Sequence, residues 1–145
     1  MKRTAHDLLE RAIAIAVEAH AGQKDKNGDP YVLHPLRMMC RVQSASERVV
    51  AVLHDVVEDT HWTFKDLKKE GFSDQIVKAL DCLTKRDGEE YEQFVRRAAS
   101  NKLARRVKLE DLKDNMDVRR FKEVTNKEKD KLQKYLWAWR KLQPE

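Results

Sequence analysis

Apolar residues recur every three or four positions along almost the whole chain, and no stretch alternates apolar and polar residues long enough to predict a strand. The 145 residues include only 4 Gly and 3 Pro, so few long loops are expected. This periodicity predicts an all-α fold, a compact bundle of about seven or eight helices in one domain.

Ser and Thr residues mark where most of these helices should begin. The candidate N-caps ahead of apolar-periodic segments are Thr4, Ser46, Thr63, Ser73 and Thr125. The pattern after the second of these caps predicts one continuous helix over 46–59, and Pro35 predicts the first turn of another helix. The last helix carries Leu132, Tyr135, Leu136 and Trp139 on one face, which we interpret as core.

The net charge of +5 is unevenly distributed. Residues 1–95 hold 14 Lys and Arg against 17 Asp and Glu, whereas residues 96–145 hold 16 against 8. The basic half is typical either of a protein that attracts a polyanion or of a solvated helical surface. It lacks the interleaved exposed aromatic residues that stack on single-stranded RNA, so we do not expect a nucleic-acid partner.

Nothing in the sequence predicts secretion or a membrane span. Residues 1–12 lack the apolar core of a signal peptide, and the longest apolar run, 12–17, is far shorter than a bilayer-spanning helix. Cys40 and Cys82 adjoin apolar residues without CxxC spacing, which predicts buried free thiols. We therefore expect a cytoplasmic protein with no membrane partner.

An apolar helical segment, 49–53, leads directly into one imidazole and three carboxylates, His54, Asp55, Glu58 and Asp59. Charged groups beside a buried helix face cost several kcal/mol unless something compensates them. A divalent ion would do so, because it accepts imidazole nitrogen and carboxylate oxygen together. The alternative is the polar end of an amphipathic helix that binds no metal.

Two further segments carry candidate site residues. His34 is expected at the junction between a Gly-containing loop and the helix that begins at Pro35. Asp111 and Asn115 are four residues apart on a predicted helix, with Lys108 one turn earlier. Each segment also has a simpler interpretation, a structural histidine in the first case and a charged surface turn in the second.

In this order and at these separations, the segments 19–35, 50–60, 83–85 and 107–117 resemble the HD-superfamily phosphohydrolase domain of RelA/SpoT homologues. They resemble the stand-alone small alarmone hydrolases more closely still. The resemblance implies an all-α HD domain over residues 1–145, with no room for a synthetase domain. It also implies one divalent ion, usually Mn²⁺, and hydrolysis of ppGpp, the alarmone of the stringent response, with release of pyrophosphate.

The resemblance also assigns roles to residues. By position in the family's motifs, the metal ligands are His34, His54, Asp55 and Asp111, the catalytic pair is Glu58 and Asp59, and Asn115 contacts the substrate. A mixed nitrogen and oxygen donor set suits Mn²⁺, Fe²⁺ or Co²⁺ better than Mg²⁺. Lys24 and Lys26 are placed to meet phosphates, and Tyr31 and Lys108 complete the expected substrate contacts.

The sequence departs from the family where the base is expected to be read. Asp25 stands where many alarmone hydrolases have an Arg against guanine, and Leu112, Asp114 and Asp117 replace the Arg, His and Arg of the family's DRxHNMR motif. A guanosine 3′-pyrophosphate therefore remains the expected substrate. Adenosine 3′-pyrophosphates, nucleoside monophosphates, and a non-catalytic nucleotide- or RNA-binding role remain alternatives, and the sequence does not predict an oligomeric state.

Overall fold

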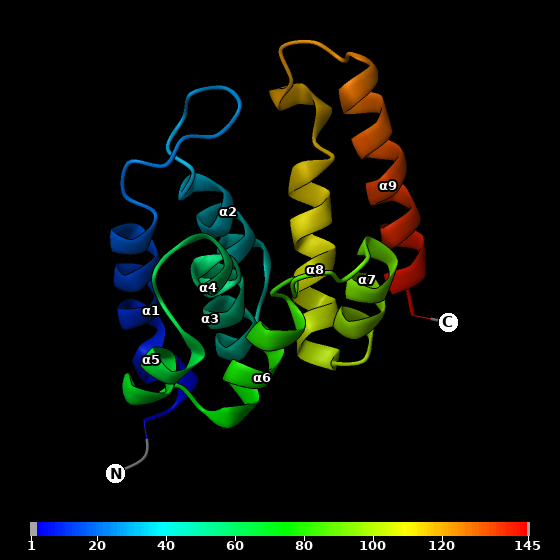
Figure 1. Cartoon of the computed structure of the whole chain (residues 1–145). Helices are drawn as coiled ribbons and strands as arrows, with labels where there is room; N and C mark the ends of the chain where they lie inside the picture. Colours follow the sequence, from blue (N-terminus) through cyan, green and yellow to red (C-terminus); the bar gives the residue numbers. More distant parts are fainter. Residues whose placement is uncertain (1–2, 145) are drawn as a thin grey trace.

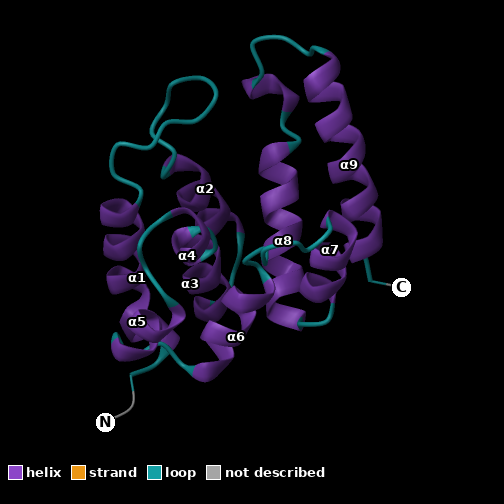
Figure 2. Ribbon diagram, in the orientation of Figure 1, coloured by secondary structure: helices purple, strands orange, loops and turns teal. Residues whose placement is uncertain are grey.

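The computed structural model describes residues 3–144, and over this range the regular structure is entirely helical (Figures 1 and 2). The helices are α1 (Ala5–Ala19), α2 (Leu33–Arg41), α3 (Ala45–Leu53), α4 (Val56–Asp59), α5 (Phe64–Lys69), α6 (Asp74–Cys82), α7 (Tyr91–Ala99), α8 (Lys102–Asn115), the 3₁₀ turn η1 (Val118–Arg120) and α9 (Asn126–Leu142). Between α1 and α2 lies one isolated antiparallel bridge, Lys24 to Pro30. The predicted all-α fold is confirmed.

Two apolar clusters hold the helices together. The larger surrounds α3, whose residues 49–53 are all buried and which packs against α1, α2, α6 and α8. The smaller joins α7, α8 and α9 through residues such as Leu112 and Leu142. Figure 1 shows α8 and α9 side by side, with α2 and α3 on the other side of α8. Helix α8 therefore contributes to both clusters and lies at the centre of the molecule.

Most of the predicted helix starts are confirmed. Thr4, Thr63 and Thr125 form capping boxes, and Ser73 accepts a hydrogen bond from the backbone N–H of Ile76. The assignment of Ser46 is wrong. Helix α3 begins two residues earlier than a cap at Ser46 would place it, at Ala45, because Ser44 is in the extended conformation and its hydroxyl accepts from the backbone N–H of Glu47.

Helix α2 also begins earlier than predicted, so His34 lies inside its first turn instead of ahead of it. Pro35 is tolerated there because the first N–H groups of a helix have no intrahelical partner. On the same helix Cys40 is exposed and free, which contradicts the expectation of a buried thiol, while Cys82 is free and half-buried.

Among the described helices none combines the length and apolarity that a membrane span requires.

The continuous helix predicted over 46–59 is interrupted. Helix α3 ends at Leu53 and α4 begins at Val56, with Asp55 at φ −107° and ψ 1° between them. Adjacent residues of an unbroken helix point about 100° apart. The interruption lets the side chains of His54 and Asp55 meet, with Nε2 and Oδ2 3.0 Å apart. The break thus replaces one predicted helix by two.

Candidate metal and substrate site

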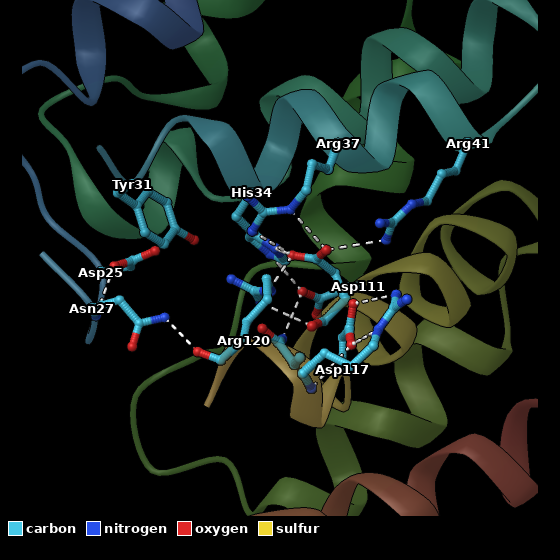
Figure 3. Close-up of polar contacts among 12 residues, drawn as sticks. Asp25, Asn27, Tyr31, His34, Arg37, Arg41, Asp111, Asp117 and Arg120 are labelled. Carbon is cyan, nitrogen blue, oxygen red and sulfur yellow. Dashed lines mark hydrogen bonds and ion pairs between the residues drawn. The ribbon is translucent and has the colours of Figure 1, made fainter. Parts of the chain in front are cut away.

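The four predicted metal ligands come from three parts of the fold: His34, His54 and Asp111 offer atoms within 4.8 Å of one another, and Asp55 adjoins His54 at 3.0 Å. His34 is on α2, His54 and Asp55 are at the break between α3 and α4, and Asp111 is on α8. The atom pair His34 Nε2 and Asp111 Oδ1 is 2.9 Å apart, and His54 Nε2 lies 3.6 Å from the same oxygen. Figure 3 shows His34 reaching from α2 toward Asp111. The geometry thus brings together side chains separated by 77 positions in the sequence.

Hydrogen bonds fix which nitrogen of each imidazole is free. His54 Nδ1 lies 2.8 Å from the carbonyl oxygen of Ala51, so it donates its proton there. Its Nε2 is buried without a hydrogen-bond partner. His34 Nδ1 lies 2.6 Å from Asp114 Oδ2 and donates to it in the same way. Burial would lower the pKa of each imidazole, but the carboxylates that the two Nε2 atoms face raise it. A divalent cation bound there would take the place of the Nε2 protons and satisfy the same oxygens.

The positive charges next to Asp111 and Asp55 keep both carboxylates ionised. Burial on its own would raise the pKa of Asp111, but the nearby Lys108, whose Nζ donates to Oδ2 at 2.8 Å, together with His34 and His54, holds it well below its usual range. Burial likewise acts to raise the pKa of Asp55, but the charge of His54 lowers it to about 2. Both carboxylates are therefore charged near neutral pH and able to act as ligands.

Glu58 and Asp59 form a second acidic group with Asp55, in which each side chain offers an oxygen within 4.8 Å of the others. Burial, followed by repulsion from Asp55, raises the pKa of Asp59, and burial raises that of Glu58 against a hydrogen bond from Lys85 that lowers it. Glu58 Oε1 accepts that backbone N–H at 2.8 Å. Glu58 lines the neighbouring cavity, whereas Asp59 lies outside its lining.

A cavity of about 670 Å³ opens from the metal ligands toward α9. All five expected substrate contacts line it, namely Lys24, Lys26, Tyr31, Lys108 and Asn115. Three of them also contact metal ligands: the Tyr31 hydroxyl donates to Asp55, and Lys108 and Asn115 donate to Asp111. These three side chains therefore hold the ligands in place in addition to facing the cavity.

The cavity has a basic and aromatic side that the sequence did not predict. It is lined by Lys85, Tyr91, Phe94, Arg120, Phe121, Lys122, Lys131, Leu132, Lys134 and Tyr135. The interpretation of the face of α9 as core is confirmed for Tyr135 and Trp139, which pack half-buried against the smaller cluster. It is wrong for Leu132, which lines the cavity, and for Leu136, which is exposed. Lys131 and Lys134 are one turn apart on α9, a spacing that could have indicated a basic face toward a ligand.

No family model matches the chain. A guanosine-3′,5′-bis(diphosphate) 3′-pyrophosphohydrolase of Aquifex aeolicus is 31% identical over 120 residues, 74% of this chain and 17% of that protein. A probable GTP pyrophosphokinase of Mycobacterium leprae is 32% identical over 127 residues, 79% of this chain and 16% of that protein. A solved structure described as "A metazoan ortholog of SpoT hydrolyzes ppGpp and plays a role in starvation responses" superposes with a TM-score of 0.74 at 23% identity, covering 98% of this chain and 87% of that one.

The chain belongs to the RelA/SpoT homologues. It spans about a sixth of the length of the two curated relatives named above. Its fold matches the SpoT-like structure over nearly the whole chain and is consistent with an HD-domain bundle.

Three of the four departures from the family's motifs lie outside the cavity of this RelA/SpoT homologue. Leu112 is buried in the smaller apolar cluster, Asp117 pairs with Arg119, and Asp114 is fully buried behind His34. These three side chains are not among those that line the cavity, so a direct contact with the base is not expected from them. Only Asp25 lines the cavity, and its Oδ1 accepts the backbone N–H groups of two residues in its own loop, at 2.8 and 3.0 Å.

Proposed function

We propose that this chain is a cytoplasmic, metal-dependent pyrophosphohydrolase that removes pyrophosphate from the 3′ position of a guanosine nucleotide such as ppGpp. The observation that carries the proposal is the convergence of His34, His54, Asp55 and Asp111 at one end of a cavity whose rim is lined with lysines. The name of the Aquifex aeolicus relative, a 3′-pyrophosphohydrolase, supports the same chemistry. The proposed partner is the small nucleotide alone, with neither membrane nor nucleic acid.

The proposed ion is Mn²⁺, because two imidazoles and two carboxylates form a donor set of intermediate hardness. When bound, such an ion polarises a phosphoryl group and lowers the pKa of water. The four side chains would hold it, and the buried, unpartnered Nε2 of His54 supports this assignment. Lys108 and Asn115 keep the Asp111 carboxylate oriented toward that point, through hydrogen bonds of 2.8 and 3.0 Å.

We assign proton transfer to Glu58, with Asp59 beside it. Because Oε1 of Glu58 is held by the backbone N–H of Lys85, the second carboxylate oxygen is available to accept a proton from the attacking water. The pKa of Glu58 is raised, chiefly by partial desolvation, which makes it a stronger base than a glutamate in bulk water. Asp59 adds negative charge next to Glu58 and does not itself line the cavity.

The rim of the cavity provides the phosphate contacts. Lys24 and Lys26 are exposed on the loop before α2, and Lys131 and Lys134 face them from α9. Their charges offset those of a polyphosphate, and the aromatic side chains of Phe121 and Tyr135 provide a surface for the base. An adenosine 3′-pyrophosphate is the second candidate substrate, because the one departure that lines the cavity, Asp25, provides no guanidinium there.

The test is to incubate metal-stripped protein, resupplied with Mn²⁺, with ppGpp, an adenosine 3′-pyrophosphate and GMP in parallel. We expect one water to be consumed for each ppGpp, giving GDP and pyrophosphate as the only products on ion-exchange chromatography. Asp55→Asn is the control, since it removes a ligand oxygen and should abolish turnover at limiting Mn²⁺. Release of single phosphates, or turnover that chelator leaves unchanged, would contradict the proposal.

A further inference from the structure

We propose that Asp114 is a positioning residue for the metal site, which holds His34 in the tautomer and orientation that present Nε2 to the ion. The proposal concerns this chain's own replacement, since the family's motif has His at this position. It rests on the proposed function for the identity of the site, but its test needs no nucleotide.

Asp114 has an unusual environment for a carboxylate. It is fully buried, on α8 one turn after Asp111. Arg37 donates to it through Nε and Nη2, both at 2.9 Å, Arg41 donates at 3.0 Å, and Arg120 approaches to 3.3 Å. Figure 3 shows Arg37 and Arg41 extending from α2 toward the same region as Arg120. Three guanidinium groups on one buried carboxylate are more than charge neutralisation requires.

These contacts decide the state of the carboxylate. Asp114 forms ion pairs with Arg37, Arg41 and Arg120, and these three cations keep the buried carboxylate ionised. An ionised carboxylate can only accept hydrogen bonds. The contact of 2.6 Å between Asp114 Oδ2 and His34 Nδ1 therefore requires the proton on Nδ1, whatever occupies the other side of the ring.

The other nitrogen of the His34 ring is also contacted by a residue of α8. His34 Nε2 lies 2.9 Å from Asp111 Oδ1. The imidazole is therefore contacted at both nitrogens by carboxylates of α8 that are three residues apart. The ring is 7% exposed and has little room to turn. Because Asp114 accepts the hydrogen bond from the Nδ1 proton, an ion would be bound through Nε2, on the side where Asp111 and His54 also converge. Carboxylates that orient a metal-binding histidine in this way change metal affinity by about 10- to 100-fold in other proteins.

The test measures Mn²⁺ binding to the metal-stripped full chain by electron paramagnetic resonance. Asp114→Asn should raise the Kd for Mn²⁺ by about 10-fold or more. Arg41→Gln, which removes one cation from Asp114 without a contact to His34, is the matched control and should stay within about threefold of the wild type. Equal affinity in Asp114→Asn and the wild type would overturn the proposal.

Asp114→Asn leaves the half-buried guanidinium groups of Arg37 and Arg120 and the exposed one of Arg41 without their carboxylate, which can prevent folding. The same substitution is therefore also made in an Arg37→Gln background and compared with Arg37→Gln alone, which has one such group fewer. We expect the Kd for Mn²⁺ to rise by about 10-fold between these two proteins as well. An unchanged Kd would count against the positioning role.

A measurement on the wild type decides the question even if neither variant folds. Long-range proton–nitrogen NMR of the protein loaded with diamagnetic Zn²⁺ should show His34 bound through Nε2 with a proton retained on Nδ1. Binding through Nδ1, or an unprotonated Nδ1, would refute the role of Asp114. Because none of these measurements uses a nucleotide, a chain that fails to hydrolyse ppGpp but shows these effects would separate failure of the proposed function from failure of this inference.

Discussion

Lys108 provides a sharp test of how the site balances its charges. Its ammonium group donates to Asp111 Oδ2 at 2.8 Å with only 11% of the side chain exposed, and its Nζ lies 5.0 Å from the ring centroid of Phe94. Lys108→Met keeps the volume of the stem but removes the charge. Loss of one partner of a buried ion pair costs about 3–5 kcal/mol. For a domain of this size, that corresponds to a fall in Tm of roughly 10 °C or more.

The fall should depend on the metal. In chelator the Asp111 carboxylate of Lys108→Met has lost its closest cation, whereas with Mn²⁺ present the ion takes over that charge. We therefore expect the rise in Tm on adding Mn²⁺, followed by differential scanning fluorimetry, to be several degrees larger in the variant than in the wild type. Lys113→Met is the matched control, because Lys113 pairs with Glu110 on the same helix while half-exposed to solvent. An equal rise in Lys108→Met and the wild type would refute the reasoning.

Three further outcomes are expected. Glu58→Gln should keep its Mn²⁺ affinity while kcat falls by roughly 100-fold or more, because the substitution removes a proton acceptor and no ligand; a parallel loss of Mn²⁺ in binding assays would contradict these separate roles. Arg97→Gln should lower the free energy of unfolding, measured by urea denaturation, by about 1–3 kcal/mol. The reason is that Arg97 donates hydrogen bonds to Glu89 and to the carbonyl groups of Asp81 and Thr84. An unchanged unfolding midpoint would show that these bonds contribute little. Asp25→Arg should shift the ratio of kcat/KM for guanosine over adenosine 3′-pyrophosphates toward guanosine, by about 10-fold, and a constant ratio would show that other residues read the base.

The helix boundaries show which parts of the fold local sequence determines. Thr4 and Thr125 were identified as caps because each bonds to residues three positions away, within the segment that the sequence displays. Neither Gly nor Pro marks the break after Leu53, so the sequence predicts a continuous helix there. The contacts made by the residues at the break include one that is distant in the sequence. His54 donates to the carbonyl of Ala51, whereas Asp55 contacts His54 and accepts a hydrogen bond from Tyr31.

The candidate site, like the fold, has residues that the sequence predicts and contacts that it does not. The resemblance to the RelA/SpoT homologues implies His34, His54, Asp55 and Asp111 as ligands, whereas the spacing within each segment alone leaves simpler interpretations open. The structure brings the four side chains close to one another. The environment of Asp114 could not be predicted, because His34 and Arg41 lie 80 and 73 positions before it in the sequence. In the sequence this residue is only a departure from a motif, whereas in the structure it is the acceptor that orients a candidate ligand.

The measurement that tests the account most directly is an anomalous-difference map from a crystal grown with Mn²⁺, collected at the manganese edge. The account predicts one peak, in contact with His34 Nε2, His54 Nε2 and carboxylate oxygens of Asp55 and Asp111. The neighbouring acidic group of Asp55, Glu58 and Asp59 provides a clear alternative position for an ion. A single peak held by Glu58 and Asp59, with both imidazoles uncoordinated, would contradict the assignment of ligands and the role proposed for Glu58.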